Sequence, residues 1–289
     1  MRRVAPLPPR DGLGPARVRL RDGGVVLDEL QARFGDQASA KVLAGEVVDA
    51  DGVVIDATTE LPAGAHVYLY RELPDEVPVP FDIPVLYRDN DIVVVDKPHF
   101  LATMPRGGHV AQTATVRLRR ELDLPELSPA HRLDRLTAGV LLFTARREVR
   151  AAYQTMFARG EVRKTYLARA GVDPALEFPM TLRSRIIKHR GQFQAVEEPG
   201  KPNAETLIER LSADLYRLTP RTGRTHQLRV HMASLGVPII GDPLYPRVID
   251  VAADDFSGPL RLLAHTLEFD DPVGGGCLRR FVSRRSING

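Results

Sequence analysis

The sequence of 289 residues has a single cysteine and no long apolar run, and both absences narrow what the protein can be. One thiol, Cys277, cannot form an internal disulfide or supply a cysteine zinc cluster, which is typical of a reducing cytoplasm. The longest apolar runs, such as residues 92–95 and 140–143, fall far short of the ~20 residues that a membrane-spanning helix needs. The first residues carry positive charge and prolines without the apolar segment of a secretory signal. We therefore expect a cytoplasmic protein with no membrane segment.

Known cofactor and metal motifs are also missing. The sequence has neither a glycine-rich phosphate loop nor the dinucleotide glycine fingerprint, so no nucleotide cofactor is expected. His226 and His231 lie five residues apart, which does not place both on one helical face, and no cysteine or third ligand lies near them. We therefore expect no cofactor and no metal centre.

The net charge of +3 is small, but the charges are unevenly distributed along the chain. Acidic residues predominate from Asp28 to Asp89, whereas residues 131–231 carry 19 lysines and arginines against 10 acidic residues. Scattered arginines usually form a solvated surface, but clustered ones also bind phosphate backbones, because binding releases counterions. Residues 131–231 thus favour a polyanion-binding surface, although charge alone is a weak indicator.

Prolines and turn residues divide the chain into four segments. Residues 1–22 contain six arginines and few apolar residues, which predicts a flexible basic arm. Residues 23–72 predict a small α/β module. The proline-rich residues 73–84 predict a linker, because repeated prolines disrupt both helices and sheets. Residues 85–289 are expected to form a second, larger domain.

The large domain is predicted to be α+β, with a mixed, mainly antiparallel sheet. Residues 85–98 predict a hairpin that turns at Asp89, Asn90 and Asp91. Further strands are expected at residues 139–144, 162–169, 205–210, 214–219 and 265–270. Helices are expected at residues 112–121, 147–158 and 224–235. In the small module we expect helices at 27–34 and 38–43 and strands at 46–48 and 66–70.

The segment HRLDRLTAGVLLFT at 131–144 places Asp134 between Arg132 and Arg135 and leads into an apolar strand. Taken alone, such a group is more often a surface ion-pair cluster than a site. A loop that runs directly into a buried strand, however, can hold a side chain at the rim of a sheet, where catalytic groups gather. The neighbouring arginines would keep Asp134 ionised, which suits a nucleophile or an electrostatic stabiliser.

Two further segments combine arginine, histidine and tyrosine. In RTGRTHQLRVH at 221–231, Arg224 follows a glycine, so its guanidinium could approach a carboxylate or a phosphate at the start of the predicted helix. In KTYLA at 164–168, strand alternation puts Lys164 and Tyr166 on one face. A strand tyrosine is usually half-buried packing. It can equally stack on a base or, once deprotonated, act as a general base.

These three segments, in this order, resemble the RluA-type pseudouridine synthases, with support from VVDKP at 94–98 and LAHTLEF at 263–269. The resemblance covers residues 85–285 and implies isomerisation of specific uridines in structured ribosomal or transfer RNA without a cofactor. It implies that Asp134 is the catalytic carboxylate, that Arg224 pairs with it, and that Tyr166 contacts the uracil and takes its C5 proton. The remaining candidate substrate-binding residues are His131, Arg132, Arg135, Lys164, Arg221, His226, Leu228 and Arg229. The chain departs from the family at Phe100, where a glycine is usual.

Residues 25–72 resemble a diverged copy of a small RNA-binding module first named in a ribosomal protein. The basic helix face of that module is largely missing, so we expect poor phosphate affinity there. Two alternatives remain: a non-catalytic RNA-binding protein that retains the synthase fold, and a two-carboxylate nucleosidase or glycosidase. Asp134, Arg224 and Tyr166 argue against the first, and no clear second acid supports the other. The expected partner is RNA, bound by a monomer without metal or membrane contact.

Overall fold

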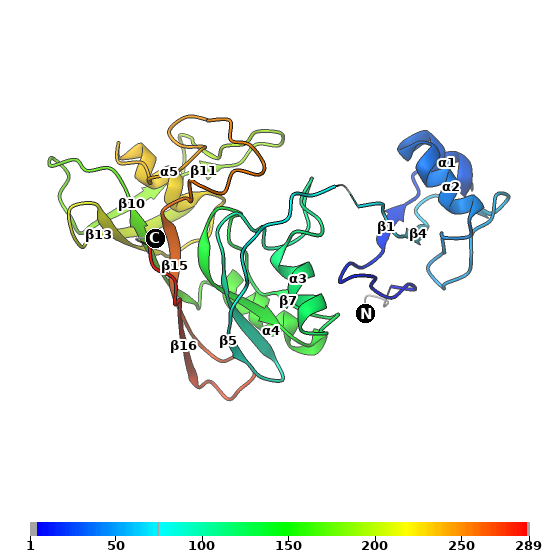
Figure 1. The fold of residues 1–289 in the computed structure, drawn as a ribbon, viewed down its shortest axis with the longest axis horizontal. Helices are drawn as coiled ribbons and strands as arrows, with labels where there is room; N and C mark the ends of the chain where they lie inside the picture. Colours follow the sequence, from blue (N-terminus) through cyan, green and yellow to red (C-terminus); the bar gives the residue numbers. More distant parts are fainter. Residues whose placement is uncertain (1–4, 74, 288–289) are drawn as a thin grey trace. The chain divides into compact units, whose positions relative to one another are not determined.

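The computed structural model describes residues 5–73 and 75–287 and divides the chain into two compact units, Met1–Asp75 and Glu76–Gly289 (Figure 1). Residues 1–4 of the expected arm and residue 74 of the expected linker lie outside the described residues. None of the helices in the described ranges combines the length and hydropathy needed to cross a bilayer.

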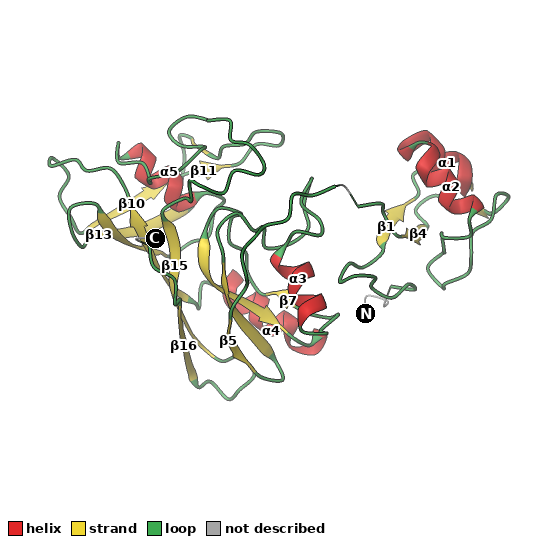
Figure 2. Cartoon of the chain, in the orientation of Figure 1, coloured by secondary structure: helices red, strands yellow, loops and turns green. Residues whose placement is uncertain are grey.

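The first unit packs two helices against short strands (Figure 2). Its elements are β1 (Ala16–Arg19), β2 (Gly24–Val25), α1 (Val26–Phe34), α2 (Asp36–Leu43), β3 (Glu60–Leu61) and β4 (His66–Leu69). Strand β1 pairs antiparallel with β4, and β2 pairs with β3. Both predicted helices are present, whereas the strand expected at 46–48 is reduced to isolated bridges at Val48.

Part of the expected flexible arm is ordered, so that prediction is wrong for the residues nearest the first unit. Strand β1 lies within it, and Val18 packs against the core of the unit. The Arg10 guanidinium lies 3.9 Å from the centre of the Tyr70 ring, whose hydroxyl donates to the Pro8 carbonyl. The alternation of arginine with small apolar residues in this segment is a strand pattern that the many arginines concealed.

The predicted linker is also wrong for residues 76–84, which belong to the second unit. The Glu76 carboxylate accepts hydrogen bonds from three successive backbone N–H groups, those of residues 110–112, at 2.6 to 3.0 Å. Ile83 is buried in one core cluster, and Phe81 packs against another. Because apolar residues alternate with the prolines, this segment can bury side chains although it forms no ladder.

The second unit is built on one ten-stranded sheet with the order β10-β13-β14-β9-β15-β8-β6-β5, while β16 also pairs with β15 and β7 with β8. All of its pairings are antiparallel except that of β8 with β15. This confirms the predicted α+β class with a mixed, mainly antiparallel sheet. The strands are β5 (Val85–Arg88), β6 (Ile92–Lys97), β7 (Ser128–Pro129), β8 (Ala138–Thr144), β9 (Arg163–Arg169), β10 (Met180–Ser184), β13 (Ala204–Arg210), β14 (Leu215–Pro220), β15 (Leu262–Asp270) and β16 (Leu278–Val282), with a separate pair β11 (Ile186–Ile187) and β12 (Val196–Glu197).

Three helices cover this sheet: α3 (Ala114–Glu121), α4 (Arg147–Ala158) and α5 (Gln227–Ser234). Successive residues of β6 and β8 alternate between two core clusters. The cluster with Val93 and Leu141 contains α3 residues, and the cluster with Val94 and Leu142 contains α4 residues. Strands β6 and β8 are therefore covered on both faces, which explains why their sequences are continuous apolar runs rather than alternating ones. Helix α5 packs with the β13–β14 side of the sheet.

The parallel pairing of β8 with β15 forms a short seam in the middle of the sheet. Its register joins Leu263 to Ala138 and Ala264 to Gly139. A Cβ at Gly139 would lie 2.2 Å from the Ala264 carbonyl oxygen, and the φ of Gly139 is +115°. Only glycine allows this close approach, because any side chain would push the two strands apart.

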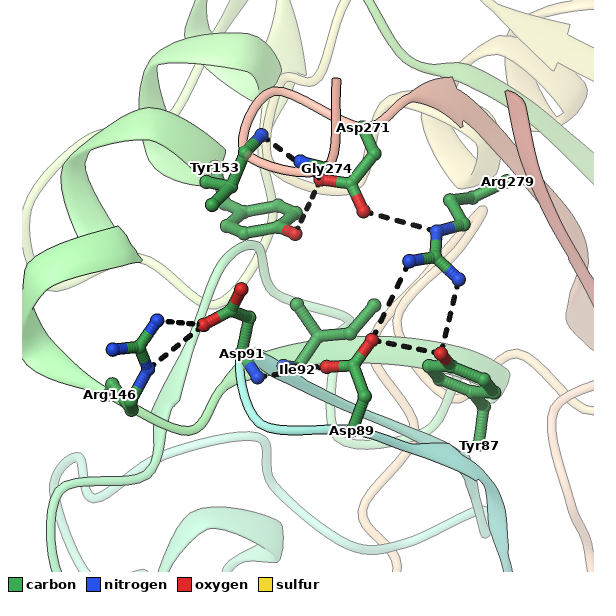
Figure 3. Close-up of polar contacts among 10 residues, drawn as sticks. Tyr87, Asp89, Asp91, Ile92, Arg146, Tyr153, Asp271, Gly274 and Arg279 are labelled. Atoms are coloured by element: carbon green, nitrogen blue, oxygen red, sulfur yellow. Dashed lines mark hydrogen bonds and ion pairs between the residues drawn. The ribbon is translucent and has the colours of Figure 1, made fainter. Parts of the chain in front are cut away.

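A buried polar network fixes the C-terminal hairpin of β15 and β16 to the rest of the second unit (Figure 3). The Asp271 carboxylate accepts hydrogen bonds from the Tyr153 hydroxyl at 2.8 Å and from Arg279 Nε at 3.0 Å. Arg279 also donates to the Tyr87 hydroxyl at 3.1 Å and lies 3.6 Å from the Asp89 carboxylate. The network thus links α4, the β5–β6 hairpin and β16, three parts distant in sequence.

We expect Asp271→Asn to lower the free energy of unfolding by about 2–3 kcal/mol at neutral pH, because a guanidinium loses its buried partner. Burial raises the pKa of Asp271, but hydrogen bonds from Gly274 and Tyr153 outweigh it and hold the pKa below its ordinary 3.8. A carboxyl with a lowered folded-state pKa stabilises the fold above its ordinary pKa and loses this contribution as the pH falls further. Urea unfolding at several pH values should therefore show a deficit that shrinks below about pH 4. A deficit independent of pH would contradict the charge assignment.

Candidate active site

Asp134 lies on the loop between β7 and β8, and its side chain is 34% exposed. Buried polar groups hold the flanking backbone on both sides. The Thr103 hydroxyl donates to the Leu133 carbonyl at 2.8 Å and accepts from the Leu133 N–H at 3.1 Å. The Thr137 N–H donates to the Asp134 carbonyl at 3.1 Å. The carboxylate is therefore presented to solvent from a fixed loop at the start of the seam.

Lys97 is a second support of this loop, and the sequence did not predict it as a site residue. Its side chain is fully buried, and Nζ donates to the carbonyls of Pro98, Leu101 and Arg135 at 2.9, 2.7 and 3.3 Å. Burial lowers the pKa of Lys97 to about 7, although the negative charge of Asp134 opposes that shift. In the sequence, only its position at the end of an apolar strand indicates a special role for Lys97. A charged side chain that is buried there requires a polar partner.

Arg229, on α5, is the cation that faces Asp134. Its side chain is only 2% exposed, and it forms a two-point contact with the buried Asp242: Nε to Oδ2 at 2.7 Å and Nη2 to Oδ1 at 2.5 Å. The remaining nitrogen, Nη1, lies 3.8 Å from Asp134 Oδ2. Burial lowers the pKa of Arg229, but the hydrogen bonds and charge of Asp242 outweigh it, so the pKa is raised. Asp242 thus fixes the guanidinium in the orientation that leaves Nη1 directed at Asp134.

The predicted pairing of Arg224 with Asp134 is wrong. Arg224 Nε donates instead to the Asn203 carbonyl at 3.0 Å, and its backbone N–H donates to Gln227 Oε1 at 3.0 Å. The helix expected from residue 224 begins only at Gln227, because His226 has a left-handed φ of 58°. Arg224 therefore lies on a turn before the helix, and Arg229, within the helix, is the cation that lies next to Asp134.

Tyr166 lies on β9 and packs against the core clusters on both sides of the seam. Burial and the nearby charge of Asp134 raise its pKa. A phenolate is therefore disfavoured here, which argues against Tyr166 as a free base and favours a neutral hydroxyl in contact with a ligand.

Tyr245 contacts both His226 and Arg229. His226 Nδ1 lies 3.0 Å from the Tyr245 hydroxyl, and the Tyr245 ring lies 5.3 Å from the Arg229 guanidinium carbon. Burial lowers the pKa of His226, while Asp134 raises it by a smaller amount. Tyr245 was not identified from the sequence, because its partners lie far from it in the chain.

The other predicted substrate-binding residues occupy different settings. His131 Nε2 accepts from the Leu142 N–H at 3.1 Å, and burial lowers its pKa to about 3, so this ring is neutral and anchors the loop to β8. Leu228 is part of the core. The other four predicted residues are cations. Arg132 is exposed, and Arg221 pairs with Glu205 at 3.1 Å. Arg135 Nη1 donates to the Phe100 carbonyl at 3.4 Å, and Lys164 Nζ donates to the Thr222 carbonyl at 3.3 Å.

Phe100 has a φ of 65°, in the left-handed region that favours glycine, which fits its place at a position usually occupied by glycine. Its ring packs against Phe81 and Phe256, with centroids 6.1 and 5.4 Å away. Packing of this aromatic cluster beside the loop therefore offsets the backbone strain.

A solved human structure, RNA Pseudouridylate Synthase Domain Containing 1, has a TM-score of 0.56 and 23% identity, over 71% of this chain and 84% of that one. The second unit thus has the fold of the pseudouridine synthases. A family model described as RNA pseudouridylate synthase matches residues 91–234.

Curated relatives agree with the family model. Ribosomal large subunit pseudouridine synthase D of Pseudomonas aeruginosa is 30% identical over 285 residues, covering 90% of this chain and 88% of the relative. Dual-specificity RNA pseudouridine synthase RluA of Salmonella typhi is 32% identical over 67% of this chain and 90% of the relative. The chain belongs to the RNA pseudouridylate synthase family. Mouse pseudouridylate synthase RPUSD2 is 38% identical over 56% of this chain, but this chain spans only 30% of that protein.

Proposed function

We propose that the protein isomerises uridine to pseudouridine within RNA, and that Asp134 is the catalytic carboxylate. The observation that carries this proposal is the pairing of a partly exposed carboxylate with a buried, fixed guanidinium: Asp134 Oδ2 lies 3.8 Å from Arg229 Nη1. A surface that only binds RNA needs cations and aromatic rings, whereas a carboxylate facing a polyanion is repulsive. The Pseudomonas aeruginosa relative is named for the ribosomal large subunit, and a further relative, of Saccharomyces cerevisiae, is named tRNA pseudouridine(32) synthase, so ribosomal and transfer RNA are both candidate substrates.

The reaction breaks the N1–C1′ bond of uridine and forms a C5–C1′ bond, with a proton lost from C5 and one gained at N1. No electrons or groups enter, so the balance is that of an isomerisation. The sugar carbon is inaccessible in a stacked helix, so the target nucleotide must leave the stack to reach Asp134. Arg229 orients the carboxylate of Asp134, and Tyr166 contacts the uracil as a neutral hydroxyl.

Release of the C5 hydrogen gives a direct test. RNA transcribed with tritium at uridine C5 should release label to water when incubated with the protein, because unmodified transcripts contain the target uridine. Both ribosomal and transfer RNA should be assayed, so that the substrate class is decided in the same experiment. If the protein binds these transcripts but releases no tritium from either, the non-catalytic RNA-binding alternative is the better account.

A further inference from the structure

The strand side of the first unit contains a hollow lined by arginines. Its volume is about 840 Å³, and it follows β1 along its length. The cations that line it are Arg17, Arg19, Arg21, Arg33 and Arg71. The acidic composition of this unit led us to expect poor phosphate affinity. Most of its few cations, however, lie together around this hollow.

Strand periodicity explains how β1 presents these side chains. Arg17 and Arg19 occupy alternate positions and so lie on one face, where the register pairs them with Tyr68 and His66 of β4. Both arginines are exposed, and Arg21 is exposed just beyond the strand. The intervening Val18 packs against the core. Strand β1 pairs only with β4 among the described strands, so its other edge has no ladder partner there.

Most of this positive charge is not neutralised within the protein. Among residues 5–73 and 75–287, no carboxylate forms an ion pair with Arg17, Arg19, Arg21 or Arg71. Arg33 differs, because it pairs with Glu29 and its Nη1 donates to the Arg19 carbonyl at 2.9 Å. Four guanidinium groups are therefore available to an anionic ligand.

The helices of this unit offer no comparable surface. Arg33 is the only basic residue of α1, and Lys41 is the only one of α2. Lys41 Nζ pairs with Glu46 at 3.1 Å. The available cations of the unit thus lie along the strand rather than on the helices, where the resemblance would have placed them.

We propose that this hollow binds the phosphate backbone of the RNA substrate through Arg17, Arg19, Arg21 and Arg71. The proposal rests on the proposed RNA substrate. Guanidinium groups match phosphate oxygens in two-point contacts, and a row of them along a strand suits a repeating polyanion better than a single phosphate. Phe34 at the end of α1 also lines the hollow and is 52% exposed, which offers a face for a base to stack on.

The test uses the full chain with Arg17, Arg19 and Arg21 all changed to glutamine. Binding of an oligouridylate and of an RNA duplex of equal length should be measured over a range of salt concentrations. Each lost phosphate contact reduces the slope of log K against log salt by about 0.7 to 0.9, so the triple variant should lose about 2 to 3 in slope. Tritium release at saturating RNA should be unchanged, because these residues belong to the first unit, whereas Asp134 and Arg229 belong to the second.

Two matched variants show whether RNA binding depends on the arginines of the hollow or only on the total positive charge of the protein. Changing Arg88, Arg120 and Arg280 of the second unit, all exposed and all outside residues 131–231, to glutamine removes the same charge and should leave the slope at its wild-type value. Changing Arg17, Arg19 and Arg21 to lysine keeps the charge and should preserve most of the slope. A glutamine variant with an unchanged slope would overturn the proposal and favour an acidic protein as the occupant. If the wild type releases no tritium, the proposed isomerase activity is contradicted, whereas the proposed RNA binding by the hollow is still decided by the salt dependence.

Discussion

Asp134→Asn is expected to fold, to bind RNA at least as tightly as the wild type, and to lose tritium release by at least about a thousandfold. Asparagine keeps the size of the side chain and removes its charge, so it cannot act as a nucleophile or stabilise a developing positive charge. Binding is preserved or tightened because a carboxylate near phosphates is repulsive.

Asp270→Asn is the matched control for this variant. Asp270 is the exposed last residue of β15, so the substitution makes the same change of charge away from the loop. It should leave the rate of tritium release unchanged. Near wild-type release by Asp134→Asn would show that another group carries the reaction, whereas equal losses in both variants would point to a general effect of charge.

Arg229→Lys is expected to lower tritium release by about a hundredfold and the free energy of unfolding by about 3 kcal/mol. A lysine ammonium cannot make the two-point contact with Asp242 and still direct a third nitrogen at Asp134. It would also leave part of the buried Asp242 carboxylate without a partner.

Arg224→Lys provides the comparison, because it makes the same substitution five residues away on the exposed turn. We expect it to retain most of its activity and stability, since Arg224 Nε only donates to a backbone carbonyl. Rates should be measured well below the melting temperature of each variant, so that unfolding does not imitate loss of catalysis. A large loss in Arg224→Lys with an active Arg229→Lys would restore the pairing that the sequence predicted.

The sequence predicted best where local signals decide the structure. Helix α4 begins and ends where its periodicity and the glycine after it predict, and β9 and β13 lie within one residue of the expected ranges. Strands β10 and β16 were missed for different reasons. Strand β10 pairs with β13, which lies far from it in sequence, and the adjacent Arg279 and Arg280 interrupt the alternation of β16.

The site shows the same division between local and long-range information. The loop with Asp134 was found because an acid between arginines before an apolar strand is a local pattern. Its cation was misassigned because the left-handed conformation of His226 delays the start of the helix to Gln227, and residues other than glycine adopt that conformation too rarely for the sequence to predict it. Asp242 and Lys97 were missed because each acts through a contact that exists only in the folded chain.

The seam at Gly139 divides the site between two parts of the sheet. Asp134 precedes β8 on one side, whereas Tyr166 on β9 and Arg229 on α5 belong to the other. Only two residue pairs join β8 to β15. Any displacement of one side relative to the other therefore changes the 3.8 Å between Asp134 and Arg229 directly. The contact of Arg229 with Asp242 lies wholly on one side, so the packing of the two parts across the seam contributes to the distance between the acid and its cation.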